Sequence, residues 1–229
     1  MAIKVYELAG ADGAQRFSPY CWMSVMALAH KGLQFEGIPW RFSEQDAIAF
    51  SGQGKVPVVV DGDKTIADSW AIAEYLEATY SDKPSLFNGP GGKAGAQFVT
   101  AWAETTLMPI IFPLVVADVH SVLRPEDAAY FRETREKVLG VPLEEACTDK
   151  GPQMAKFRAA LEPLRAMLAK QPFLGGDAPS YSDYVLFGYF MFARNTYPQD
   201  LLEASDAVYA WREKLLDAFG GLARKSKSA

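Results

Sequence analysis

Cysteine and histidine are scarce in this chain, and their scarcity excludes two kinds of scaffold. Two of the 229 residues are cysteines, Cys21 and Cys147, so a framework of disulfides is not expected. Two others are histidines, His30 and His120, which leaves little material for a zinc site. We therefore expect no metal, and we interpret both histidines as surface or packing residues.

Excess positive charge and long apolar runs are also missing. The 28 acidic side chains outnumber the 23 lysines and arginines, whereas a nucleic-acid partner would require a cationic surface. No apolar run reaches the ~20 residues that span a bilayer. The start of the chain lacks the order of regions that a signal peptide has. We expect a cytoplasmic protein with neither a nucleic-acid nor a membrane partner.

What is present is the composition of a folded protein, with 49% hydrophobic and 22% charged residues. The first 80 residues alternate between patterns typical of strands and helices, in the order β-α-β-(α)-β-β-α. Helices are predicted to open at Ser18-Pro19 and at Asp68-Ser69, and 43–50 is either a short helix or a loop. The predicted strands are 3–8, 34–40, 56–60 and 64–66.

A linker rich in glycine and proline, 81–92, precedes an all-helical remainder. Proline is expected to bend the first helix near Pro109 and Pro113 and to interrupt the third at Pro163. The segment 181–194 is aromatic and apolar, so we expect it to be the buried centre of this part. The predicted helices are 93–120, 125–139, 154–168, 181–194 and 205–219.

Four short motifs follow one another in a fixed order along the chain. They are Ser18-Pro19-Tyr20-Cys21, Lys55-Val56-Pro57-Val58, Asp68-Ser69 and Ser180-Tyr181-Ser182-Asp183. With these four motifs in this order, the chain resembles the glutathione transferase family over essentially its whole length. The resemblance implies an α/β, thioredoxin-like, glutathione-binding domain, 1–82. It also implies an all-helical domain, 92–229, that contributes the pocket for a hydrophobic co-substrate.

Three stretches further resemble one branch of that family, the bacterial lignin β-etherases and related fungal transferases. They are 18–22, 68–76 and 173–177. The family implies attack of the glutathione thiolate on an electrophilic carbon, and this branch implies cleavage of a β-aryl ether. The alternatives are a binding protein for glutathione or hydrophobic ligands, and a non-catalytic relative of the same fold.

Ser18 is the candidate catalytic residue. A dithiol oxidoreductase opens this helix with Cys-x-x-Cys, but here Ser18 stands first and only Cys21 remains. The free N–H groups of a helix N-terminus, with the Ser18 hydroxyl, can stabilise the thiolate of glutathione. The alternative is that Ser18 only caps the helix. Cys21, one turn in, is expected to pack rather than react.

Val56 and Pro57 are candidate contacts to the backbone of glutathione. The resemblance implies a cis Val56-Pro57 bond, which turns the N–H and C=O of Val56 toward an extended peptide. The residues alone leave open an ordinary trans proline at the start of a strand. No contact to the glycine end is evident between 41 and 53, and Lys55 or Gln53 are the candidates for it.

Asp68 and Ser69 are candidates for the γ-glutamyl end. Ser69 at a helix start suits a carboxylate, and Asp68 suits an ammonium group. A plain N-cap is the alternative. Ser180 and Asp183 match a variant capping box and are assigned to folding.

The helix 93–120 is expected to line the co-substrate pocket. An aromatic and apolar lining suits a hydrophobic, aromatic co-substrate, although such residues on an amphipathic helix also form core. The family further implies a homodimer. The candidate lining residues are Trp102, Thr105, Thr106, Met108, Pro109 and Phe112, with Phe17 and Tyr20 from the first domain.

Overall fold

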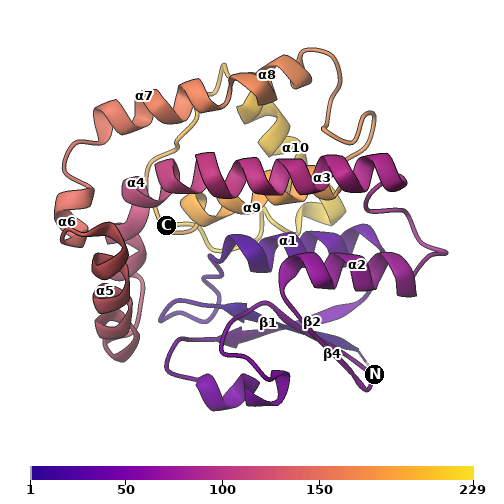
Figure 1. Cartoon of the computed structure of the whole chain (residues 1–229), viewed down its shortest axis with the longest axis horizontal. Helices are drawn as coiled ribbons and strands as arrows, with labels where there is room; N and C mark the ends of the chain where they lie inside the picture. Colours follow the sequence, from indigo (N-terminus) through magenta and orange to yellow (C-terminus); the bar gives the residue numbers. More distant parts are fainter. Residues whose placement is uncertain (1) are drawn as a thin grey trace.

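A four-stranded mixed sheet forms the base of the molecule in the computed structural model, which describes residues 2–229 (Figure 1). The strand order is β2-β1-β3-β4; β1 pairs parallel with β2, and the other pairs are antiparallel. This is the mixed sheet that the α/β, thioredoxin-like prediction requires. The strands are β1 (Ile3–Leu8), β2 (Phe35–Trp40), β3 (Val58–Asp61) and β4 (Lys64–Ala67).

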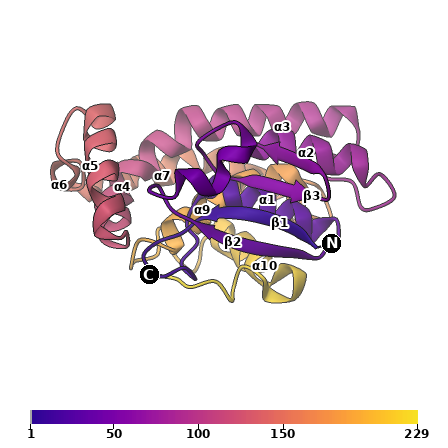
Figure 2. The same cartoon turned by 90° about the horizontal axis from the view of Figure 1, so that it is seen from below.

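Two helices, α1 (Pro19–His30) and α2 (Ser69–Thr79), lie on the face of the sheet that is turned toward the rest of the chain (Figures 1 and 2). A 3₁₀ turn, η1 (Gln45–Ser51), fills the connection between β2 and β3. Pro19 stands at the first position of α1, where its fixed φ suits a helix start. Both predicted helix starts are therefore confirmed.

The remainder of the described chain is helical, which confirms the predicted fold class. α9 packs against α1, and nearly all of its side chains are buried, so it is the predicted central helix. Its start is fixed by the Asp183 carboxylate, which accepts the N–H of Ser180 at 2.9 Å. The helices are α3 (Pro90–Trp102), α4 (Met108–Ser121), α5 (Pro125–Leu139), α6 (Leu143–Ala146), α7 (Lys150–Ala160), α8 (Glu162–Leu168), α9 (Tyr181–Arg194) and α10 (Ala207–Gly221).

Several details differ from the sequence-based expectation. α3 begins at Pro90, inside the predicted linker 81–92, and α7 begins at Lys150 instead of residue 154. α3 and α4 are joined by a π-helical turn, Ala103–Leu107, so the regular hydrogen bonding is interrupted before Pro109. The short helix α6 was not predicted, because four residues carry no readable periodicity. The break at Pro163 is as expected: α7 ends at Ala160 and α8 starts at Glu162.

The continuous helix Pro90–Ser121 is 32 residues long, and its length and apolar composition would also suit a membrane span. The prediction concerned uninterrupted apolar runs, and it did not anticipate that a whole helix would have the length and composition of a span. Core helices of globular domains meet the same criterion, and here Leu107, Ile111 and Leu114 are fully buried against neighbouring helices.

Candidate active site

A cavity of about 690 Å³ lies where the start of α1, the loops after β2 and before β3, and helices α4 and α5 meet. Its wall is mostly aromatic and aliphatic, and the charged residues in it are Lys55 and Arg135. Residues far apart in the sequence therefore share one apolar space, as a ligand site requires. The predicted site residues in its wall are Phe17, Ser18, Tyr20, Lys55, Val56, Met108, Pro109 and Phe112.

Ser18 caps α1 and also lines the cavity. Its Oγ accepts the backbone N–H of Cys21 at 3.3 Å, and the residue is 5% exposed. Because the oxygen serves as acceptor in the cap, the hydroxyl hydrogen stays available as a donor. Within residues 2–229 the Cys21 sulfur, a weak acceptor, lies in reach of that hydroxyl, and this contact opposes the effect of burial on the pKa of the Cys21 thiol. The two alternatives for Ser18, cap and thiolate donor, are therefore compatible.

Cys21 is buried beneath the helix start. It is 1% exposed, and its thiol lies 3.9 Å from the carbonyl oxygen of Tyr6. Burial raises the pKa of the Cys21 thiol to about 12. A thiol that stays protonated is a poor nucleophile, which agrees with a packing role.

Glu7, on β1, is a buried acid near Cys21. It is 6% exposed and forms an ion pair with Arg16 at 3.7 Å. Burial raises the pKa of the Glu7 carboxyl to about 7, and Arg16 opposes that shift. The sequence does not reveal this buried acid, since the alternation of residues along β1 does not show how deeply its polar face is buried.

The Val56-Pro57 bond is cis, as the resemblance implies. Within residues 2–229, neither the N–H nor the C=O of Val56 has a hydrogen-bond partner. The N–H of Asp68 donates to the carbonyl of Pro57 at 3.3 Å, which holds the start of α2 beside this loop. Val56, Asp68 and Ser69 thus lie along one edge, although only Val56 is in the wall of the cavity.

Asp68 is the N-cap of α2. Its Oδ1 accepts the N–H groups of Trp70 and Ala71 at 2.9 and 3.1 Å. The helix start therefore has fewer free N–H groups than the sequence suggested, because Asp68 itself uses two of them. The second carboxylate oxygen of Asp68 and the Ser69 hydroxyl have no partner among residues 2–229.

Lys55 and Gln53 differ in position. The Gln53 amide accepts the N–H of Lys55 at 3.1 Å and donates to its carbonyl, so this side chain braces the loop. Lys55 is exposed at the cavity, where the side chain of Gln45 also lies. The sequence does not reveal Gln45 as a site residue, because the region 43–50 has no clear periodicity.

Trp102 and Thr106 are not in the wall of this cavity. Trp102 lies instead in a second apolar cavity of about 490 Å³ between α3, α8 and α9, and Thr106 is in neither wall. The physical reason is the π turn between Trp102 and Met108, which adds a residue and changes which side chains face the sheet domain. The prediction that both residues line the co-substrate pocket is not supported. Thr105 is exposed, and its hydroxyl donates to the carbonyl of Ala101.

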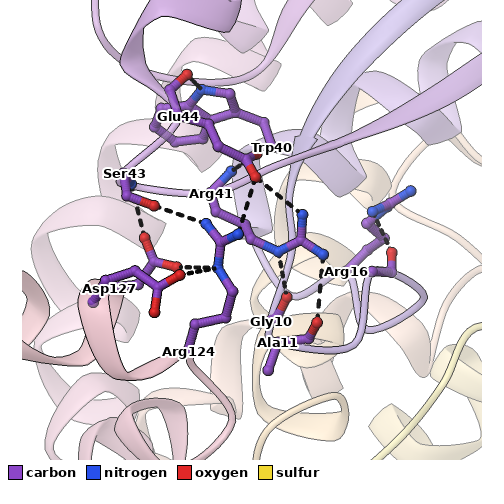
Figure 3. A network of polar contacts seen from close by, with 11 residues as sticks. Gly10, Ala11, Arg16, Trp40, Arg41, Ser43, Glu44, Arg124 and Asp127 are labelled. Atoms are coloured by element: carbon purple, nitrogen blue, oxygen red, sulfur yellow. Dashed lines mark hydrogen bonds and ion pairs between the residues drawn. The ribbon is translucent and has the colours of Figure 1, made fainter.

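A polar network outside the predicted set fixes one wall of the cavity (Figure 3). Arg124, before α5, bonds Ser43 Oγ at 2.7 Å and pairs with Glu44 at 3.2 Å and Asp127 at 2.8 Å. Asp127 in turn accepts the N–H of Ser43 at 2.7 Å. Arg41 joins the network through Glu44 and the carbonyl of Gly10. The turn after β2 is therefore held against α5.

This network positions aromatic side chains in the wall of the cavity that Phe42 and α5 form. Phe42 packs on Tyr130 and Phe131 of α5, with ring centroids 5.6 and 6.1 Å apart. The guanidinium of Arg135 lies over the rings of Phe131 and Phe42 at 5.0 and 5.6 Å. The four-residue spacing of Phe131 and Arg135, which places them on one helix face, was the available sequence indication.

Comparisons with known proteins point to one family. The glutathione S-transferase N-terminal domain matches residues 17–79, and the C-terminal domain matches residues 94–219. Glutathione S-transferase 4 of Zea mays is 29% identical over 221 residues, which cover 93% of this chain and 87% of that protein. Glutathione S-transferase F10 of Arabidopsis thaliana is 28% identical over 70% of each chain.

Solved structures give the same result. A glutathione transferase of Phanerochaete chrysosporium has a TM-score of 0.84 and 26% identity, covering 94% of this chain and 96% of that one. A glutathione S-transferase of Ceriporiopsis subvermispora, solved with glutathione, has a TM-score of 0.79 at 24% identity over 96% of each chain, a likeness of fold alone. Since the C-terminal domain match by itself spans more than half of the residues, the chain belongs to the glutathione S-transferase family.

Proposed function

We propose that the protein is a glutathione transferase in which the thiolate of glutathione attacks a carbon of a hydrophobic, aromatic electrophile. One observation carries this proposal. The Ser18 hydroxyl and the unpaired backbone of Val56 border the same cavity of about 690 Å³, whose wall is mainly aromatic. A thiol-activating donor, a peptide-binding edge and an apolar pocket are the three parts that such a reaction needs.

The reaction requires the protein to activate the thiol of glutathione and to position the two substrates. A free thiol has a pKa of about 8.5, so little of it is ionised at neutral pH. A hydrogen bond from Ser18 to the thiolate contributes roughly 1.5–3 kcal/mol. That would lower the thiol pKa by about 1 to 2 units. The thiolate then forms the C–S bond while the leaving group departs with its electron pair.

Glutathione would lie along the edge formed by Val56, Asp68 and Ser69. The Val56 N–H and C=O would pair with its backbone, as a strand edge pairs with a peptide. The second oxygen of Asp68 would take the ammonium group, and the Ser69 hydroxyl the neighbouring carboxylate. Lys55 would meet the glycine carboxylate, with Gln53 bracing its backbone.

The co-substrate would occupy the aromatic part of the cavity, between Phe17, Tyr20, Met108 and Phe112. Burial raises the pKa of the Tyr20 phenol, so this side chain stays protonated and can donate a hydrogen bond at neutral pH. We propose a β-aryl ether as one substrate of this kind. Its attacked carbon carries an aryloxy group that leaves as a phenolate. A role in detoxification or aromatic degradation would follow.

We further propose that the protein is a cytoplasmic homodimer. Phe98 on α3 is 74% exposed beside the second apolar cavity, which Trp102 also lines. A large apolar side chain on such a surface is a common interface feature. The symmetric pairing of two α3 helices would cover it.

Retention on immobilised glutathione, followed by a turnover screen that includes β-aryl ethers, tests the proposed function. Retention with turnover supports a transferase, and conversion of β-aryl ethers supports the narrower activity. Retention without turnover of any electrophile favours the alternative, a protein that binds glutathione or hydrophobic ligands without catalysis. Failure to bind glutathione at millimolar concentration would refute both.

A further inference from the structure

Arg135 of α5 brings a positive charge into the wall of the apolar cavity. Its charged companion there is Lys55, and no acidic residue of the described part of the chain lines the cavity. The chain as a whole carries a net charge of −5, so the cavity has the opposite sign to its molecule. Two cations in one apolar space attract an anion, and Lys55 is already assigned to glutathione.

The guanidinium of Arg135 has no carboxylate partner among residues 2–229. Each of the other arginines except Arg194 forms an ion pair with an aspartate or glutamate. Arg135 donates from Nη1 to the hydroxyl of Thr134 at 2.9 Å, and the phenol of Tyr130 also lies within its reach. A guanidinium carries five N–H donors, so most of its hydrogen-bonding capacity is unused.

Aromatic rings hold this cation in place. The central carbon of the guanidinium lies 5.0 and 5.6 Å from the ring centroids of Phe131 and Phe42, and Figure 3 shows the network that fixes the turn containing Phe42. A cation–π contact uses the charge of the group and none of its N–H donors, so these stay free to meet a planar anion. Burial lowers the pKa of Arg135, and the nearby Tyr130 phenol opposes that shift, whereas no carboxylate contributes to it.

We propose that Arg135 binds the carboxylate of an aromatic co-substrate, so that the cavity prefers anionic aromatic electrophiles to neutral ones. This inference rests on the proposed transferase function and names the substrate class of that site. A carboxylate and a guanidinium form two parallel hydrogen bonds, which fix the direction of the ring as well as its affinity. Arg135 is thus a specificity-determining residue, distinct from the thiol-activating Ser18.

Two probes differing in one charge test this. We would measure glutathione conjugation of 4-(chloromethyl)benzoate and of its methyl ester; in both, the C–S bond forms and chloride leaves. In R135Q, kcat/KM for the carboxylate should fall about tenfold, mainly through KM, as expected when a charge-assisted hydrogen bond is removed. The ester rate should change less than about twofold, because its contacts are apolar.

Variants on the same helix separate charge from packing. R135K keeps the charge and should retain part of the carboxylate preference. R132Q removes an exposed guanidinium that pairs with Glu136 and Glu144 outside the cavity, and it should leave both rates unchanged. An equal fall for both probes in R135Q would mean that Arg135 only supports the aromatic wall, and the inference would be overturned.

A binding measurement keeps this inference distinct from the transferase proposal. Calorimetry would compare S-(4-carboxybenzyl)glutathione with its methyl ester in the wild type and R135Q. Tighter binding of the carboxylate in the wild type alone supports the inference even without turnover. Equal binding of both conjugates overturns it and leaves the transferase proposal intact, whereas binding of neither overturns both.

Discussion

The Oγ of Ser18 accepts the backbone N–H of Cys21 at 3.3 Å. The same side chain therefore caps the helix and lines an apolar cavity. Cys21, whose sulfur is buried below, supplies the N–H but no reactive thiol. A serine at this place is therefore suited to act on the thiol of a ligand, since the Cys21 thiol beside it is buried and stays protonated.

Glutathione should stabilise the folded protein. A ligand that binds only the native state adds about 2.7 kcal/mol to the free energy of unfolding at 100 times its dissociation constant. For a chain of this length we expect the melting temperature to rise by roughly 5 °C or more. Free cysteine at the same concentration is the control. A melting temperature that millimolar glutathione leaves unmoved would count against the site.

Asp68→Asn should weaken glutathione binding without unfolding the start of α2. Asp68 has φ +80°, and asparagine both tolerates this conformation and caps helices well, whereas alanine does neither. Removing the charge should raise the dissociation constant of glutathione about tenfold. The pKa of the bound thiol should change much less, because we place Asp68 at the γ-glutamyl end of glutathione and Ser18 at its sulfur.

The control for this substitution is Asp63→Asn on the exposed turn between β3 and β4. A calorimetric titration measures the affinity of both variants, and thiolate absorbance measures the pKa of the bound thiol. An unchanged affinity in Asp68→Asn would remove this residue from the glutathione site.

Local chemistry was readable from the sequence because caps and turns depend on neighbouring residues. Ser18-Pro19, Asp68 and the Ser180–Asp183 pair each set a helix start within four positions, and all three are found where predicted. The lining of the cavity was only partly predictable. Met108 and Trp102 lie on one continuous helix, but they line different cavities because a π turn lies between them. No residue pattern in the sequence indicates this turn.

Contacts between residues far apart in the chain could not be predicted from the sequence. Arg124 and Arg135 look alike as basic residues of one amphipathic segment. The structure pairs Arg124 with Glu44, 80 positions away, and leaves Arg135 over two aromatic rings. Whether a charged side chain forms an ion pair depends on such distant residues, and these cannot be identified from periodicity or spacing.

Stability should depend on pH through Glu7. Burial raises the pKa of this carboxyl from 4.5 to about 7 in the folded state. An acid with a raised folded pKa contributes stability below its unfolded pKa, and that contribution disappears as pH rises through the folded value. Between pH 4.5 and 8, the wild type should lose about 3 kcal/mol of unfolding free energy relative to Glu7→Gln.

Urea unfolding at a series of pH values measures this difference. Glu36→Gln, on the exposed edge strand β2, is the matched control and should follow the wild type. Parallel pH profiles for the wild type and Glu7→Gln would show that Glu7 titrates normally.

The proposed dimer can be tested at Phe98. Light scattering at micromolar concentration should give twice the chain mass of 25.2 kDa. Phe98→Asp places a charge on the apolar surface and should reduce this to the monomer mass, because burying an unpaired charge is costly. Phe50→Asp is a control at another exposed aromatic residue, 52% exposed on η1. A monomeric wild type would contradict the proposal.

Ser18→Ala should slow turnover far more than it destabilises the fold. Loss of an N-cap costs about 0.5–2 kcal/mol, so a small drop in melting temperature is expected whatever the role of Ser18. If the hydroxyl stabilises the thiolate, bound glutathione should titrate about 1 to 2 units higher in the variant. Turnover below that pKa should fall roughly tenfold or more, since each 1.36 kcal/mol is a factor of ten.

Cys21→Ser separates this mechanism from one that uses the chain's own thiol. The sulfur of Cys21 is buried, and its pKa is raised to about 12, so replacing it should leave both the thiolate titration and the rate near the wild-type values. The opposite pattern, an inactive Cys21→Ser and an active Ser18→Ala, would require Cys21 to reach the substrate. The protein would then act as a monothiol oxidoreductase that uses glutathione. Thiol–disulfide exchange requires the thiolate of Cys21, whereas conjugation requires only the thiolate of glutathione.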